Sequence, residues 1–186
     1  MPRYRPKSQD RTSLGKTFLQ PPFARLSMGG TEKGKAMSGD TDLIKLYSAR
    51  ILELAADIPH HARLDAPATS VKKRSPLCGS TVTVDVTLED GRVLAFGQDV
   101  KACALGQAAA SVVGGAIIGT TPDQIVKARD ELRVMLKEDG PAPTAPFEGL
   151  EVLRPAAAYK NRHASILLTL DAASEAVAEL ADTESA

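Results

Sequence analysis

The regular alternation of apolar and polar residues from Thr81 to Leu88 constrains this chain more than any other feature of its sequence. A period of two residues predicts a strand with one face buried in a core. Asp90-Gly91 follows, a pair typical of a tight hairpin turn, and Arg92 to Gln98 is expected to return as a second strand. A shorter strand is expected from Ala68 to Lys73. The sequence therefore predicts a three-stranded antiparallel sheet.

Helical patterns lie on both sides of these strands. Apolar residues recur at spacings of three and four in several segments, which are 42–58, 104–118, 121–138, 148–153 and 161–180. Thr121-Pro122 is a helix start with a capping residue and proline at the first position. Strands followed by helices indicate an α+β domain in two layers, with a small three-stranded antiparallel sheet packed against several helices and a long C-terminal helix.

Three glycines lie inside the segment expected to form the helix over 104–118: Gly106, Gly114 and Gly115. Glycine destabilises a helix by about 1 kcal/mol relative to alanine. We therefore expect that these positions either pack closely against another element or mark a break in the helix.

The chain changes character near residue 36. Residues 1–36 carry eight basic and two acidic residues, with several prolines, and predict a basic, disordered N-terminal extension. Residues 37–186 predict a single domain. Three interpretations of the extension stay open: a start codon assigned upstream of Met37, a partner-binding arm, or a transit peptide. A transit peptide would place the protein in the mitochondrial matrix instead of the cytoplasm.

Composition excludes several classes of protein. The 23 acidic residues balance the 23 basic ones, and aromatic residues make up only 4% of the 186 residues, without tryptophan, so nucleic acid is not expected as a partner. No apolar run reaches the roughly 18 residues that a membrane span needs. Two cysteines form no disulfide framework, which indicates an intracellular protein. Phosphate-loop, dinucleotide, metalloprotease and nucleophile-elbow motifs are all missing, so we do not expect an enzyme.

Three residues are candidates for chemistry. Cys78 lies at the turn into the alternating strand, and Cys103 lies where the hairpin ends and a helix begins. A helix N-terminus favours the thiolate, the form of cysteine that binds metal. His163 lies at the start of the last helix, whereas His60 and His61 are interpreted as structural or solvent-facing. Alternatively, each cysteine serves as a small buried apolar residue, which is the commoner role of a free cysteine.

The order of several motifs carries a resemblance. Pro76-Leu77-Cys78-Gly79, Cys103-Ala104-Leu105-Gly106 and His163-Ala164-Ser165-Ile166-Leu167 follow one another as in the NifU-like (IscU/SufU-type) iron–sulfur cluster assembly scaffold family, which the chain resembles over about residues 42–180. The resemblance implies the IscU/NifU-N/SufE-like fold and a site at one tip of the molecule. It also implies that three cysteines and an aspartate hold zinc, iron or a nascent [2Fe–2S] cluster. A cysteine desulfurase and recipient proteins are the implied partners.

Two of the family's four ligand positions are changed in this chain. Ser80 stands where the family has the aspartate, and Ala164 stands where it has the third cysteine. The ligand set implied by the resemblance is therefore reduced to Cys78, Cys103 and His163. Two thiolates and an imidazole suit zinc as well as iron, and a second subunit, a small thiol or a nearby residue would complete a [2Fe–2S] cluster.

Three hypotheses of function follow. The first is an iron–sulfur scaffold or carrier with the reduced ligand set. The second is a degenerate scaffold homologue, without metal, that acts as a protein-interaction module or accessory subunit of a larger complex. The third is a zinc-holding regulator or sulfur-transfer enzyme that uses one cysteine as acceptor. Ala164 favours the second hypothesis, while the retained Cys78, Cys103 and His163 favour the first.

Overall fold

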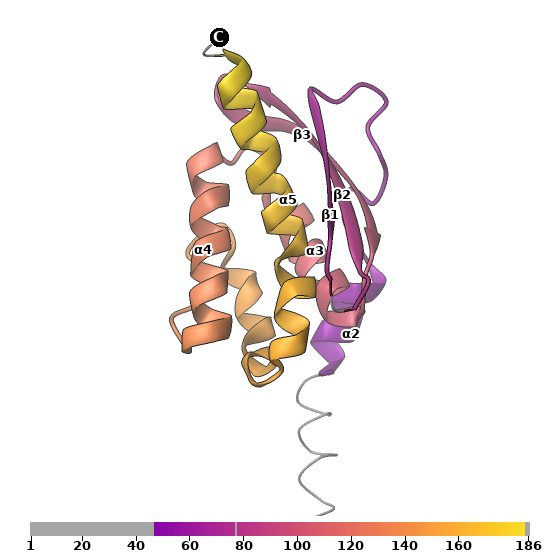
Figure 1. Cartoon of the computed structure of the whole chain (residues 1–186), viewed down its shortest axis with the longest axis vertical. Coiled ribbons are helices and arrows are strands. Elements are labelled where there is room, and N and C mark those ends of the chain that lie inside the picture. Colours follow the sequence, from indigo (N-terminus) through magenta and orange to yellow (C-terminus); the bar gives the residue numbers. More distant parts are fainter. Residues whose placement is uncertain (1–46, 77, 185–186) are drawn as a thin grey trace, which may run out of the picture. The chain divides into compact units, whose positions relative to one another are not determined.

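The expected strands form one antiparallel sheet in the computed structural model, which describes residues 47–76 and 78–184 (Figure 1). They are β1 (Thr69–Arg74), β2 (Thr81–Glu89) and β3 (Arg92–Lys101), in the order β1-β2-β3. Val84 of β2 lies opposite Val71 of β1 and Gln98 of β3. The predicted three-stranded antiparallel sheet is confirmed.

Five helices accompany the sheet in the described part of the chain. They are α2 (Ala49–Ala56), α3 (Ala104–Ala116), α4 (Pro122–Glu138), the 3-10 helix η1 (Glu148–Ala158) and α5 (Lys160–Glu184). The long helix α5 packs on β1 and β2 and also contacts α3 and α4 (Figure 1). This arrangement confirms the α+β class with its long C-terminal helix. None of the helices in the described ranges is long and apolar enough to cross a membrane.

Capping residues in the sequence mark where helices begin. Thr121 caps α4, because its hydroxyl accepts a hydrogen bond from the backbone of Gln124 and the Gln124 side chain accepts one from the backbone of Thr121. Ser48 caps α2 with a single bond, in which its hydroxyl accepts from the Ile51 backbone N–H. The basic extension predicted for residues 1–36 and the start of the helix expected from Asp42 lie outside the described residues.

The central strand is buried more completely than its alternating pattern predicts. Its apolar face packs on the helices, but Thr83 and Asp85 on the polar face are buried as well. The segment after α2 covers that second face, where the carbonyl of Ala62 lies so close to Gly97 that a Cβ there would be 2.5 Å from it. The sequence predicted only a half-buried strand, because alternation does not reveal a covering loop.

An ion pair attaches the covering segment to the sheet. The fully buried carboxylate of Asp85 accepts hydrogen bonds from Arg63 Nε at 2.6 Å, from Arg63 Nη2 at 2.8 Å and from the Leu64 amide at 2.9 Å. Burial raises the pKa of Asp85, but these hydrogen bonds outweigh burial and lower it below its usual value. The carboxylate is therefore charged at neutral pH.

Gln98 makes a second attachment at the same segment. Its Nε2 donates to the carbonyl of Pro59 at 2.8 Å and to that of Ala110 in α3 at 3.1 Å. Gly114 allows this approach, since a Cβ there would lie 2.5 Å from Gln98 Nε2. The expectation of close packing at the α3 glycines is confirmed at this position.

Replacing Asp85 by alanine should lower the free energy of unfolding by about 1–3 kcal/mol, because three hydrogen bonds to a buried carboxylate are lost. Urea denaturation at pH 7 measures this loss. The matched control is Glu53→Ala, which removes an exposed carboxylate paired with Arg50 and should cost less than about 0.5 kcal/mol. Because the folded-state pKa of Asp85 is lowered, its contribution is present at pH 7 and lost as the pH falls below about 4. Equal losses in the two variants would contradict the role of Asp85.

Candidate functional site

Both cysteines lie at the same end of the sheet. Cys78 is in the turn that joins β1 to β2, and Cys103 is the N-cap residue of α3, directly after β3. The strand register explains their proximity, because Thr81 lies opposite both Arg74 and Lys101. The sheet thus presents the two thiols at one tip of the domain, where the family resemblance implies a site.

A chain of serine hydroxyls connects the two thiols. Cys78 Sγ lies 3.0 Å from Ser80 Oγ, and its thiol also donates to Ser75 Oγ at 3.2 Å. Ser165, on α5, donates to Ser80 Oγ at 3.1 Å and lies 3.5 Å from Cys103 Sγ. These three serines are buried, whereas both cysteines are partly exposed. The site therefore combines two accessible sulfur atoms with a buried hydroxyl network.

The position of Ser165 depends on a glycine in α3. A Cβ at Gly106 would lie 2.7 Å from Ser165 Oγ and 3.0 Å from the Ser165 carbonyl oxygen. Such distances are too short for any side chain larger than hydrogen, so Gly106 allows α3 and α5 to approach closely. Gly115 differs, because its nearest neighbour, Pro59 Cγ, is at an ordinary 3.9 Å.

Hydrogen bonding tunes the Cys78 thiol. Partial burial raises its pKa, but hydrogen bonds with Ser75, Ser80 and Ser165 together lower it to about 7. The thiolate of Cys78 is therefore favoured at neutral pH relative to that of an ordinary cysteine. This is the form that binds metal or attacks an electrophile.

His163 has a different environment. Its Nε2 lies 3.1 Å from the carbonyl oxygens of both Ala156 and Ala157, at the end of η1. Carbonyls only accept hydrogen bonds, so Nε2 carries the proton and Nδ1 is the remaining donor atom for a metal. The residues described hold no group of three or more His, Cys, Asp or Glu side chains placed to bind a metal ion. The structure thus brings Cys78 and Cys103 together without adding His163 to them.

Ala164 marks the position of the missing third cysteine. It is half-buried and lines two adjoining hollows on the surface of α5, one of which also contacts Ser75 and Pro76 in the turn that carries Cys78. A side chain at this position therefore faces the edge of the site.

His60 and His61 have structural roles, in line with their interpretation from the sequence. The His60 ring packs edge-on against Phe96. The backbone carbonyl of His60 accepts a hydrogen bond from the backbone N–H of Gln98 at 2.9 Å. The Nε2 atom of His61 accepts one from the Val100 amide at 3.4 Å. Both histidines help to fix the covering segment on β3.

The role of the serine hydroxyls was not predicted from the sequence, where Ser80 was identified only as the residue that replaces the family's aspartate. Ser75 and Ser80 flank Cys78, and Ser165 follows His163 by two residues. Their proximity in sequence to the candidate residues was the available signal. Their function as hydrogen-bond partners of sulfur required the three-dimensional arrangement.

Comparison with known structures identifies the family. A nitrogen-fixing NifU-like protein (N-terminal) from Brucella abortus is 42% identical, with a TM-score of 0.74 over 76% of this chain and 98% of that chain. No protein-family model and no curated protein matches the chain. The identity and coverage show that the chain belongs to the NifU-like family, which confirms the resemblance inferred from the motifs.

Two more distant structures share the fold. One is a hypothetical protein solved at 2.3 Å resolution, 21% identical with a TM-score of 0.65. The other is a putative iron–sulfur cluster assembly scaffold protein for the SUF system from the thermophilic Fervidobacterium islandicum, 18% identical with a TM-score of 0.64. Each match covers 72% of this chain and 98% of the other chain.

Replacing the two α3 glycines should have opposite effects on stability. Gly106→Ala should lower the free energy of unfolding by about 1–3 kcal/mol, because the new methyl group collides with Ser165. Gly115→Ala should raise it by up to about 1 kcal/mol, because alanine favours the helix and meets no close neighbour. Urea denaturation measures both. Stabilisation by both substitutions would show that the close approach of α3 and α5 is not required.

The reactivity of Cys78 should depend on its hydroxyl neighbours. We expect its alkylation by iodoacetamide, followed by peptide mass spectrometry, to rise with pH around a midpoint of about 7. Ser80→Ala should move this midpoint to higher pH, because a hydrogen bond to the sulfur is lost. Ser111→Ala is the control, since the Ser111 hydroxyl donates to the Asp57 carbonyl away from both cysteines. An unchanged midpoint in Ser80→Ala would contradict the hydrogen-bonding account.

Proposed function

We propose that this protein is an iron–sulfur cluster assembly scaffold or carrier that holds iron, zinc or a nascent [2Fe–2S] cluster as cargo on Cys78 and Cys103. The observation that supports the proposal most strongly is the placement of both thiols at one tip, joined by the hydroxyl chain through Ser80 and Ser165. Membership of the NifU-like family supports the same function.

The donor atoms fit such cargo in part. Two thiolates neutralise a divalent ion and supply two of the four positions around tetrahedral zinc or a cluster iron. The serine hydroxyls are neutral and act by holding the sulfur atoms in place. His163 is the remaining candidate ligand, through Nδ1. We propose that a small thiol or a partner protein supplies the ligands that Ala164 and Ser80 do not.

An open ligand set has a consequence for cargo transfer. Fewer protein ligands hold a metal less tightly, so cargo leaves more readily for a recipient. A cysteine desulfurase as the source of sulfur and iron–sulfur proteins as recipients are the partners that a NifU-like scaffold would need. The lowered pKa of Cys78 supports ligand binding at neutral pH, because less free energy is needed to remove the thiol proton.

Reconstitution tests the proposal. Anaerobic protein is incubated with iron, cysteine, a reductant and a cysteine desulfurase, after which bound iron and sulfide are measured and the visible spectrum is recorded. We expect iron and acid-labile sulfide in equal amounts. Both should be lost in Cys78→Ala and in Cys103→Ala, whereas Ala164→Cys should increase cluster retention by restoring a thiol at the edge of the site.

The histidine is tested by a matched pair. His163→Gln should reduce the bound iron if Nδ1 is a ligand, while His60→Asn, in the covering segment, should leave it unchanged. Folded protein that binds no iron in this reconstitution, and no zinc when zinc is supplied in place of iron, would contradict the scaffold proposal. That outcome would favour the second hypothesis, an interaction module or accessory subunit.

A further inference from the structure

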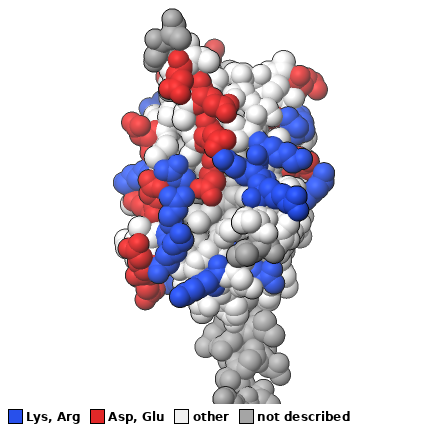
Figure 2. Space-filling view, in the orientation of Figure 1, with Lys and Arg blue, Asp and Glu red and all other residues white. Residues whose placement is uncertain are grey.

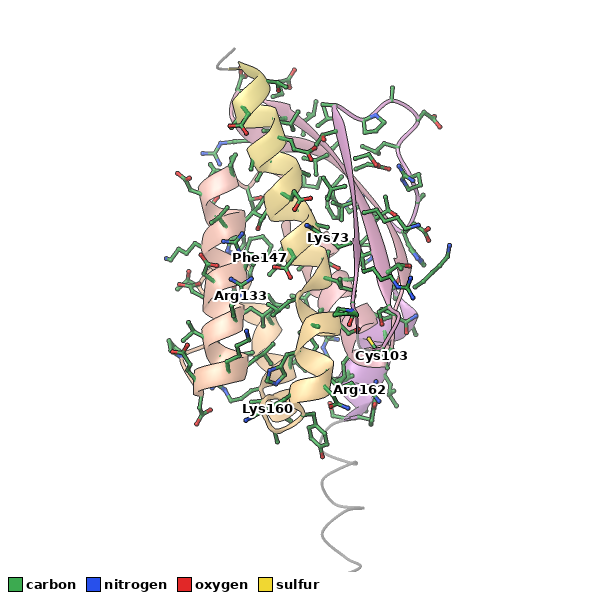
Figure 3. The ribbon with its side chains drawn as sticks, in the orientation of Figure 1. Lys73, Cys103, Arg133, Phe147, Lys160 and Arg162 are labelled. Atoms are coloured by element: carbon green, nitrogen blue, oxygen red, sulfur yellow. The ribbon has the colours of Figure 1, made fainter. Side chains whose placement is uncertain are left out.

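The two hollows that meet at Ala164 form one groove along α5, which we call the α5 groove. Its floor extends along α5 from Lys160 to Ala178, roughly 27 Å at the rise of an α-helix. One side is formed by α4 and the other by the end of β1 with the following turn. Lys73 of β1 and Arg133 of α4 lie on opposite sides of α5 (Figure 3).

Basic side chains dominate both sides of the groove. Six line it, and they are Lys73, Arg74, Arg129, Arg133, Lys137 and Lys160. Among residues 47–76 and 78–184, two acidic side chains line it, and both are already neutralised: Asp171 pairs with Arg133 at 3.1 Å, and Glu175 pairs with Lys73. Figure 2 shows basic side chains in two groups on this face, with acidic and uncharged surface between them.

Three of the basic residues are available to a ligand. Within the described part of the chain, Arg74, Lys137 and Lys160 form no ion pair, and each of them is exposed. Their positive charges therefore stabilise no ion pair within the described part of the domain. An anionic partner would be attracted to them.

The floor of the groove supplies apolar contact. Ala164, Leu167 and Leu168 line it beside Ser174. The Ser174 hydroxyl oxygen is buried away from solvent. A bound ligand therefore meets the apolar side chains of the floor and the charged side chains on the two sides.

We propose that the α5 groove binds an extended, acidic segment of a partner protein. About eight extended residues span its length. Alternating acidic side chains would reach the basic residues on the two sides, while the segment lies over the apolar floor. The groove adjoins Ser75 and Pro76, so a bound segment lies next to the turn that carries Cys78. This inference goes beyond the proposed metal site and does not require it.

Fluorescence anisotropy tests the proposal with the full chain and a fluorescein-labelled peptide of alternating aspartate and alanine. A peptide with asparagine in place of aspartate is the control. We expect the acidic peptide alone to bind, with affinity that falls as salt is added. The triple variant R74Q/K137Q/K160Q should bind about ten-fold more weakly, because each exposed charge pair changes affinity by roughly two- to three-fold.

Matched variants separate the groove from general charge. R50Q/K101Q/K127Q removes the same charge from exposed residues outside the groove and should bind the peptide like the wild type.

Several outcomes would overturn the proposal. They are equal binding of both peptides, equal loss in both triple variants, or binding of anionic vesicles or a DNA oligonucleotide with none of the peptide. Concentration-dependent dimerisation that R74Q/K137Q/K160Q abolishes would assign the groove to a second copy instead. Zinc content is measured in parallel and should be unchanged in this variant, so that failure of the groove and failure of the metal site are distinguishable.

Discussion

The close approach of α3 and α5 at Gly106 is the constraint on which the site depends. It brings Ser165 of α5 within hydrogen-bonding distance of both Ser80 and Cys103, so that three separate segments of the chain meet. The same packing directs Ala164 toward the turn that carries Cys78. If α5 were displaced from α3 by the size of one methyl group, Ser165 would move away from Ser80 and Cys103. The hydroxyl network would then be separated from the thiols.

Much of the fold could be predicted from the sequence because its signals are local. Alternation identified β2, Asp90-Gly91 identified the hairpin, and Thr121-Pro122 identified the start of α4. The burial of Asp85 could not be predicted, because its partner Arg63 is 22 residues away in a segment without regular structure. Local patterns do not report contacts of this kind.

The same distinction between local motifs and contacts between distant residues applies to the site. The motifs around Cys78 and Cys103 indicated that the thiols belong together, and the register of the sheet places them at one tip. The serines gave no signal by themselves, because a serine hydroxyl can serve a cap, a turn or a thiol with the same sequence appearance. His163 was expected beside the cysteines, yet its Nε2 is engaged by two carbonyls of η1.

The central claim is that Cys78 and Cys103 bind one metal ion together. X-ray absorption spectroscopy of the zinc-loaded protein tests it most directly, because the method counts the sulfur atoms around the metal. The account predicts two sulfur ligands at about 2.3 Å with lighter atoms in the other positions. A zinc shell with one sulfur or none, or a shell that keeps two sulfur atoms after Cys103→Ala, would contradict it.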